Sequence, residues 1–212
     1  MSRTATAVER LLQDGSGRRP RADARRNVER LVIAAREAAS DGGEITAHEI
    51  ARRAGVGVGT FYRRVGSLEV LLQAVLSELL DEIVAAADLG LADPDPWAAL
   101  CRFAGSYIRL RNELCDVNEA LGGIIDHERT VLRDRIRLLV ERAQAAGAMR
   151  TDVTWQDVAF LMVSTSTGDR TLGLRAGDLQ WERNLQIVLD GLRTDDPNPL
   201  PGGPPQLPPS QI

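Results

Sequence analysis

The chain has 212 residues, of which 43% are hydrophobic, so it is long enough to bury one large core or two small ones. Its two cysteines make no disulfide or zinc framework and no apolar run approaches the roughly 20 residues that cross a bilayer, so we expect a soluble cytoplasmic protein without membrane, metal or cofactor. The net charge of −4 hides an asymmetry, because residues 1–65 carry +5 and residues 66–212 carry −9, which favours a polyanionic partner for the N-terminal part.

The first 21 residues are expected to form a flexible basic arm, with a short helical turn at AVERLLQ. The last arginines of this arm are Arg18, Arg19 and Arg21. Helical spacing begins near Ala22 and ends at the sequence SDGG, since glycine is a common helix stop. A further helix is predicted over 46–53, because Thr46 and Glu49 form the T-x-x-E pattern of a capping box.

A short helix over 58–64 and a longer helix capped by Ser67 follow. The longer helix carries an apolar stripe from Leu68 to Val84, which is wide enough to contact two cores. Apolar spacing predicts more helices over 96–111, 113–122, 126–147, 154–174 and 178–193. Because no segment alternates as a strand does, the predicted fold class is all-α. The proline-rich residues 195–212 cannot continue a helix and are expected to be disordered.

The stretch AGVGVGTFYRRV, residues 54–65, has glycines at alternate positions. A dinucleotide fingerprint needs G-x-G-x-x-G after a strand and a Walker loop needs a lysine, which this chain lacks, so neither nucleotide motif fits. The pattern indicates a helix-turn-helix in which Gly55 takes a positive φ in the turn and Gly57 caps the second helix. Gly59 permits a close approach, either to the preceding helix or to a DNA backbone, and the sequence leaves both open.

The stretch TAHEIARRAGVGVGTFYRRVGSLEVLLQAVL resembles the DNA-binding region of the TetR family of bacterial transcriptional regulators. The family pattern is T-x-x-x-I-A-x-x-A-G-V-S-x-G-T-x-Y-x-H-F-x-S-K-x-x-L. The matching residues are Thr46, Ile50, Ala51, Ala54, Gly55, Val56, Gly59, Thr60, Tyr62, Ser67 and Leu71. Three departures stand out: the usual serine is Gly57, the His-Phe pair is Arg64-Val65, and a lysine that often holds a phosphate is Leu68.

The resemblance implies that the helix over 58–64 enters the major groove of DNA. Thr60 and Tyr62 would bind phosphates, which set the register of the protein on the duplex. Arg63 is the candidate for reading a guanine, with a phosphate contact as the alternative, and Val58 would meet a thymine methyl group. The remaining candidate DNA contacts are Thr46, Arg53, Gly57, Arg64 and the arm arginines Arg18, Arg19 and Arg21.

The resemblance also implies a three-helix DNA-binding domain over 22–87 and a helical-bundle domain for effector binding and dimerisation over 88–194. The last two predicted helices would pair with those of a second copy, so that a homodimer binds a palindromic operator in double-stranded DNA. A small-molecule effector would release the DNA, which makes the expected regulator a repressor. The candidate wall residues of the effector cavity are Trp97, Phe103, Tyr107, Asn118, His127 and Trp155.

The sequence has no catalytic or metal motif, because its two histidines, His48 and His127, lie in different regions and no glycine-framed serine is present. We therefore expect that the protein is not an enzyme. Two other classes stay open at this point. One is a small-molecule-binding protein or enzyme that carries the helix-turn-helix without regulating an operator, and the other is a nonspecific DNA-packaging protein.

Overall fold

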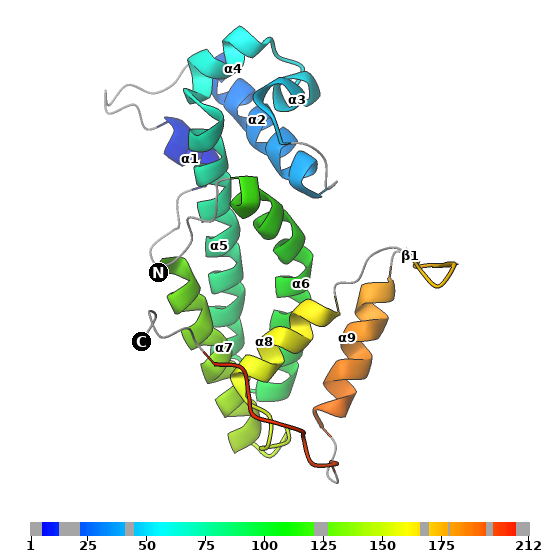
Figure 1. The fold of residues 1–212 in the computed structure, drawn as a ribbon. Helices are drawn as coiled ribbons and strands as arrows, with labels where there is room; N and C mark the ends of the chain where they lie inside the picture. The colour runs from blue at the N-terminus through cyan, green and yellow to red at the C-terminus, as the bar shows by residue number, and fades with distance from the viewer. Residues whose placement is uncertain are drawn as a thin grey trace. The chain divides into compact units, whose positions relative to one another are not determined.

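The structure is a computed structural model that describes residues 6–12, 22–40, 45–120, 127–165, 170–177, 179–193 and 197–206. These residues form nine helices and one small hairpin, so the predicted all-α fold class is confirmed (Figure 1). The chain divides into an N-terminal unit, Met1–Glu82 with Leu110–Glu128, and a C-terminal unit, Ile83–Arg109 with Arg129–Ile212. Helices α5 and α6 contribute residues to both units, and they span Leu68–Ala92 and Pro96–Ala120.

Three helices of the N-terminal unit pack on one another (Figure 1). They are α2 (Ala22–Ser40), α3 (Ala47–Arg53) and α4 (Val58–Val65). Apolar residues at three- and four-residue spacing face the shared core, and Leu31, Ile50 and Phe61 are completely buried there. Burying a side chain of this size stabilises the fold by about 1.5–3 kcal/mol. Packing therefore holds the two short helices α3 and α4, which would not be stable alone.

The short helical turn expected at AVERLLQ within the basic arm is present as a helix. Helix α1, Ala7–Leu12, packs against α2, and Ala7 is completely buried. Arg10 Nη2 also donates to Asp81 Oδ2 of α5 at 2.5 Å. This burial and ion pair offset the conformational entropy of the segment, a tertiary effect that a basic composition does not reveal. The arm arginines Arg18, Arg19 and Arg21 lie outside the described residues.

In the C-terminal unit, the last turns of α5 pack closely against α7, which spans His127–Ala145. A Cβ atom at the buried Gly90 would lie 3.1 Å from Leu139 Cδ2, so glycine allows this approach. The guanidinium group of Arg142 donates to the carbonyl oxygens of Gly90 at 3.0 Å, Leu91 at 2.8 Å and Asp93 at 2.8 Å. These bonds reach the last carbonyl groups of α5, which no following helical turn can satisfy completely, although the Gly90 carbonyl also accepts from the N–H of Asp93 at 3.1 Å.

Helix α8, Trp155–Ser164, begins with a complete capping box. Thr154 Oγ1 accepts from the N–H of Asp157, and the Asp157 carboxylate accepts from the N–H of Thr154. Helix α9, Gln180–Gly191, follows and lies within the range predicted for the last helix. Its apolar face buries Leu185 and Leu189 at the predicted four-residue spacing.

Two predicted helix boundaries are wrong. The helices predicted over 96–111 and 113–122 are the single helix α6, because no glycine or proline separates them. The helix predicted over 154–174 ends at Ser164 as α8, and β1 (Arg170–Thr171) pairs with β2 (Leu174–Arg175) in an antiparallel hairpin. Leu172 and Gly173 form its turn with φ angles of 48° and 79°, the left-handed pair that suits a two-residue hairpin.

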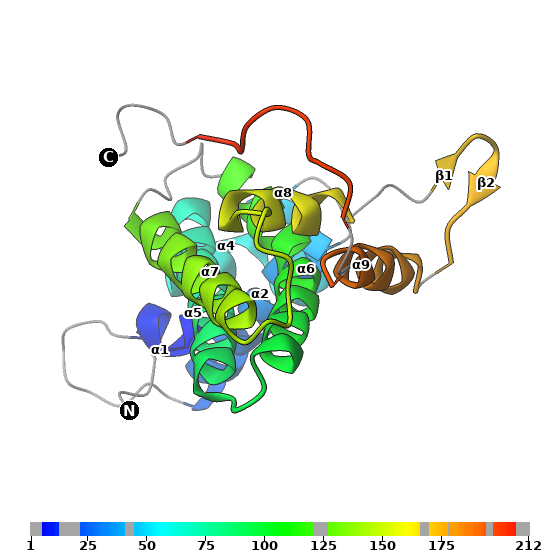
Figure 2. The same cartoon turned by 90° about the horizontal axis from the view of Figure 1, so that it is seen from below.

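The described part of the C-terminal tail, residues 197–206, forms neither helix nor strand. This segment lies beside α8 in both views (Figures 1 and 2), and its Pro205 is partly buried. Within the described ranges, no helix has the length and apolar character that would let it cross a membrane.

Candidate nucleic-acid interface

The candidate interface begins at the N-terminus of α3, where Thr46 caps the helix as predicted. Thr46 has an extended backbone, with φ −121° and ψ 154°, and its Oγ1 accepts from the N–H of Glu49 at 3.2 Å. Only this half of the predicted capping box is present, because the Glu49 carboxylate accepts from two arginines instead. Arg52 Nη2 lies 2.6 Å and Arg53 Nε 2.8 Å from Glu49 Oε1.

The turn between α3 and α4 has the hydrogen bonds of a Schellman motif. The N–H of Gly55 donates to the Arg52 carbonyl at 3.2 Å, and the N–H of Val56 donates to the Ala51 carbonyl at 3.0 Å. Gly55 has a φ of +63°, which confirms the predicted left-handed residue of the turn. The two helices are thus joined by a four-residue connection, Ala54–Gly57, whose geometry depends on a single glycine.

Helix α4 has a buried side and an exposed side. Gly57 caps its N-terminus with φ −71° and ψ 147°, as predicted. Phe61 is 0% and Val65 4% exposed, so the core side of the helix is fixed in place. Tyr62 is 50% exposed, and Arg63 beside it is also exposed. Tyr62 and Arg63 therefore lie on the exposed side of a helix whose opposite side is packed into the core of the unit.

Gly59 lies on the exposed side of α4, and its surroundings separate the two explanations left open above. A Cβ atom at Gly59 would meet no other part of the described chain within 4 Å. Close packing against α3 is therefore not the reason for this glycine. A glycine in a helix interior costs about 1 kcal/mol relative to alanine, and the described fold shows no packing gain that offsets this cost.

The side chains at the end of α4 carry positive charge. Arg63 Nη2 donates to Thr60 Oγ1 at 3.3 Å, which joins two predicted contact residues one turn apart. Arg64 is half-buried, and its Nε finds no hydrogen-bond partner among the described residues. Ser67 caps α5 by accepting from the N–H of Val70 at 3.2 Å, as its position in the sequence predicted.

The predicted contact residue Arg53 is already engaged in the isolated chain. Its side chain is 22% exposed and is paired with Glu49, whereas the neighbouring Arg52 side chain is 66% exposed. The hydrogen bonds from Arg52 and then Arg53 lower the pKa of Glu49 from 4.5 to about 2. Glu49 thus stays ionised and offsets part of the positive charge at the end of α3.

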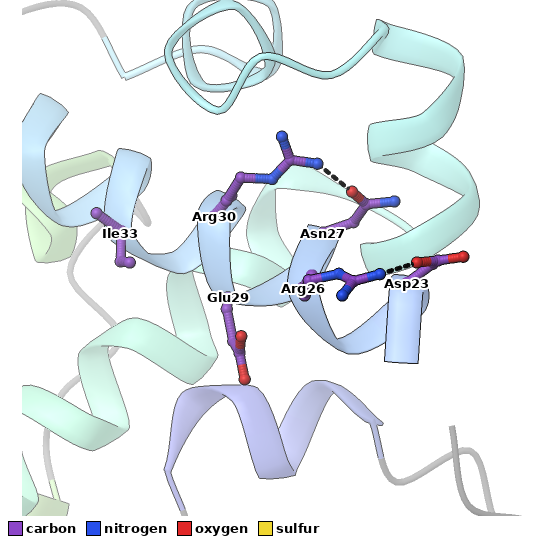
Figure 3. A pocket seen from close by; sticks show the side chains of 6 residues that line it. All are labelled: Asp23, Arg26, Asn27, Glu29, Arg30 and Ile33. Carbon is purple, nitrogen blue, oxygen red and sulfur yellow. Dashed lines mark hydrogen bonds and ion pairs between the residues drawn. The ribbon is translucent and has the colours of Figure 1, made fainter. Parts of the chain in front are cut away.

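A shallow hollow of about 600 Å³ lies along α2 of the same unit (Figure 3). Its lining includes Arg26, which pairs with Asp23, and Arg30, whose Nη2 donates to the neutral Asn27 at 2.5 Å. Arg30 also extends toward the turn, where its Nη1 lies 3.9 Å from the position of a Cβ at Gly55. Arg30, an exposed arginine of α2, was not among the DNA-contact candidates that the sequence suggested.

The residues predicted to line an effector cavity do not gather at one place. Tyr107 and Trp155 both line a hollow of about 290 Å³ in the C-terminal unit. Phe103 is 1% exposed and packs beside Tyr107, with ring centres 6.1 Å apart, so it is a core residue next to this hollow. Trp97 instead lies under Arg193, whose guanidinium carbon is 5.2 Å from the ring centre. The side chains of Asn118 and His127 lie outside the described part of the structure.

Comparison with known proteins identifies relatives of both units. Residues 95–194 match the family model described as transcriptional regulator SbtR-like, C-terminal domain. The crystal structure of a TetR transcription regulatory protein from Mycobacterium vanbaalenii is 31% identical, with a TM-score of 0.56, over 82% of this chain and 99% of that chain. The TetR transcriptional regulator SCO0520 from Streptomyces coelicolor is 26% identical over 80% and 99% of the two chains, with a TM-score of 0.56.

The TetR family regulator PfmR from Thermus thermophilus shares the fold, with a TM-score of 0.58 and 20% identity over 77% of this chain and 96% of that chain. No curated protein sequence matches the chain. The similarity to the Mycobacterium vanbaalenii protein extends over nearly the whole length of that protein. It is consistent with the helix-turn-helix that α3 and α4 form in this chain. The chain therefore belongs to the TetR family of transcriptional regulators, which are DNA-binding proteins with a helix-turn-helix.

Proposed function

We propose that the protein represses transcription by binding a palindromic operator, with α4 of each protomer in a major groove. The observation that carries this proposal is the exposed side of α4. It combines a glycine with open space around it, a half-exposed tyrosine and an exposed arginine on a helix anchored by Phe61. A helix of this kind can approach a duplex closely without losing its position in the fold.

Each predicted residue has a defined task in this complex. Tyr62 and Thr60 donate their hydroxyl groups to phosphates and so set the register of the helix. Arg63 reaches O6 and N7 of a guanine once it leaves Thr60, to which it now donates at 3.3 Å. Val58, near the start of α4, lies where it can contact a thymine methyl group. The remaining proposed phosphate contacts are Thr46, Arg53, Gly57, Arg64 and the arm residues Arg18, Arg19 and Arg21.

Dimerisation through α8 and α9 is part of the proposal, because family members usually act as dimers. Exposed apolar side chains on the hairpin and α9 support it. Leu172 is 97%, Leu174 67% and Ile187 68% exposed, and burying them against a second copy would remove this surface from water. A two-fold dimer presents two recognition helices about one helical turn of DNA, ~34 Å, apart or a multiple of it.

We place the effector site in the hollow that Tyr107 and Trp155 line, a space formed mainly by apolar side chains. A molecule of matching apolar character would favour a dimer conformation with the wrong spacing between recognition helices. The resulting loss of DNA affinity is limited by the difference between the affinities of the molecule for the two conformations. Such a regulator acts on bacterial DNA in the cytoplasm.

The substitution Gly59→Ala tests the proposed approach of α4 to DNA. The free protein should become more stable by up to about 1 kcal/mol, because alanine favours the helix and its Cβ meets nothing in the chain. Binding to a duplex from the region upstream of its own gene should weaken by about tenfold, since the added methyl group holds the helix away from the DNA. Thermal unfolding and fluorescence anisotropy measure the two effects.

The matched control is Gly57→Ser, which restores the residue usual in the family at a position where a Cβ also meets nothing within 4 Å. Glycine can donate to a phosphate only through its backbone N–H, which serine keeps, so this variant should keep its DNA affinity and gain a side-chain cap. A Gly59→Ala protein that is stabilised and binds the duplex as tightly as the parent would contradict the proposed approach.

A further inference from the structure

The hollow of the C-terminal unit is formed partly by the C-terminal tail of the chain itself. Its lining comes from α6, α7 and α8 and from the segment 197–206, and includes Tyr107, Ile136, Trp155, Phe160, Pro205 and Gln206. Three of these side chains are aromatic and come from two different helices. The tail thus supplies one wall of a space that the helices leave otherwise open.

Two tail residues line the hollow, Pro205 and Gln206, and they differ in burial. Pro205 is partly buried, whereas its neighbours Gly203, Pro204 and Gln206 are exposed. Phe160 at the rim of the hollow is 66% exposed, so the aromatic surface extends beyond the space that Pro205 covers. Pro205 is therefore the one residue of the sequence 203–206 that is partly withdrawn from solvent beside the aromatic lining, and the tail is not buried as a whole.

A second attachment lies upstream in the same segment. Arg150 Nη2 donates to the carbonyl oxygen of Asn198 at 3.3 Å, and the N–H of Arg150 donates to the Leu192 carbonyl at 2.9 Å. Pro197 is partly buried and lines a separate hollow with Met149 and Arg193. The segment is thus held at its beginning by the loop after α7 and near its end by the aromatic hollow.

Proline-rich segments suit aromatic-lined grooves for two reasons. Their fixed φ angles leave little conformational entropy to lose on binding, and the flat proline ring packs well against aromatic rings. Prolines occupy positions 197, 199, 201, 204 and 205 of this segment. Attachment to the same chain also raises the effective concentration of the segment at the hollow to about the millimolar range.

We propose that the aromatic wall of this hollow is a proline-recognition surface, and that the chain's own segment 197–206 is its resident partner through Pro205. Because Pro205 forms one wall of the hollow, a small apolar molecule bound there contacts the tail as well as the helices, so the seating of the tail affects effector binding. This regulatory consequence rests on the proposed effector site. The seating of the tail itself does not, and it can be measured without DNA or effector.

The test uses the full chain with Trp155 as the only tryptophan, after the substitutions Trp97→Phe and Trp181→Phe. In this background, Pro205→Asp should expose Trp155, and the acrylamide quenching constant of its fluorescence should rise about twofold, because a charged side chain does not stay against aromatic rings. Pro204→Asp is the matched control, since it adds the same charge at an exposed neighbour, and should leave the quenching constant unchanged. The proposal is overturned if the two variants have the same quenching constant, whether that constant equals the parent value or exceeds it.

Adding the segment back gives a second measurement. A synthetic peptide of residues 197–206, at millimolar concentration, should lower the quenching constant of the Pro205→Asp protein toward the parent value. The same peptide with alanine in place of Pro205 should leave the quenching constant unchanged. If both peptides lower it equally, the proline is not what the hollow recognises. Circular dichroism of each variant shows whether the helices are intact, so that unfolding is not mistaken for release of the tail.

The outcomes separate this inference from the proposed function. If the tail is not seated, quenching is equal in the two aspartate variants while operator binding is unaffected. If the protein is not an operator-binding repressor, DNA binding fails while the quenching difference persists.

Discussion

Among the connections between helices that contain a residue with a positive φ, two differ clearly in how well the sequence suits that conformation. The turn from α3 to α4 places Gly55 at φ +63°, and the hairpin between α8 and α9 places Leu172 at φ +48°. Glycine adopts this conformation freely, but for leucine it costs about 1–2 kcal/mol. The leucine is also 97% exposed, so no contact within the described chain compensates for the strain.

This difference indicates two kinds of surface. The first connection is complete within the chain and leads into α4, whose exposed side presents the polar side chains of Tyr62 and Arg63, which suit a hydrated, charged duplex. The second is strained and presents apolar side chains, Leu172 and Leu174, which suit another protein surface. The hairpin turn requires the left-handed conformation at Leu172, and a leucine side chain that finds no contact there within the described chain is expected where a partner supplies one. The predictions below test this contrast.

The largest effect is expected on DNA binding. Arg63→Ala should reduce affinity for the operator by about 10–100-fold and relax the preference at one base pair, because an arginine that reads guanine contributes about 1–3 kcal/mol of discrimination. Tyr62→Phe should weaken binding to all sequences alike, since it removes a phosphate contact. Competition binding with duplexes that vary at each operator position measures both. If neither variant changes binding, α4 is not the recognition helix.

The second prediction concerns the stability of the helix-turn-helix. Gly55→Ala should lower the free energy of unfolding by about 1–2 kcal/mol, because the added Cβ makes the left-handed conformation unfavourable. Steric overlap adds little, since the nearest atom to that Cβ would be Arg30 Nη1 at 3.9 Å. The control Gly57→Ala should change stability far less, because Gly57 has a φ of −71° that any residue adopts. Urea denaturation of both variants checks this, and equal losses would refute the assigned turn.

The third prediction addresses the hairpin. Leu172→Asn should relieve backbone strain, since asparagine tolerates the left-handed region, and it should also weaken the dimer by about tenfold through the lost apolar contact. Leu89→Asn is the control, because Leu89 is 69% exposed but lies on α5, outside the hairpin. Sedimentation velocity over a dilution series measures the dimer dissociation constant. The proposed role of the hairpin fails if both variants dimerise like the parent.

The smallest effect is a pH dependence at α3. The pKa of Glu49 is lowered from 4.5 to about 2, so its contribution to stability is fully present above pH 4.5 and is lost as the pH falls toward 2. Glu49→Gln removes this contribution, and stability should then fall less steeply over the same pH range. Because the carboxylate and its arginines are at the surface, the difference should be small and should shrink in concentrated salt. Urea denaturation at several pH values gives the free energy of unfolding as a function of pH for the parent and for the Glu49→Gln variant.

The DNA-binding half of the molecule could be predicted from the sequence because its signals are local. The Thr46 cap and the Gly55 turn each depend on residues within one or two turns of the chain. A local motif of this kind is also specific enough to identify the family. The sequence reading went wrong on Glu49, because the competition between Thr46 and two arginines for its carboxylate depends on side-chain placement.

The C-terminal unit could be predicted only in outline, because its hollow joins distant parts of the chain. Tyr107 and Trp155 were chosen by residue type and do line one hollow, but Trp97 was chosen in the same way and lies against Arg193. The wall formed by Pro205 comes from a segment expected to be disordered. Contacts between residues so far apart follow from tertiary packing, which helix periodicity does not encode.

The central claim is that the exposed side of α4 reads an operator, and a comparison of two duplexes tests it most directly. One duplex comes from the region upstream of the protein's own gene and the other has a random sequence of the same length, with both titrated at the same salt concentration. We predict a preference of about a thousandfold or more for the upstream duplex, as specific regulators show. Equal affinity for the two duplexes would contradict the account.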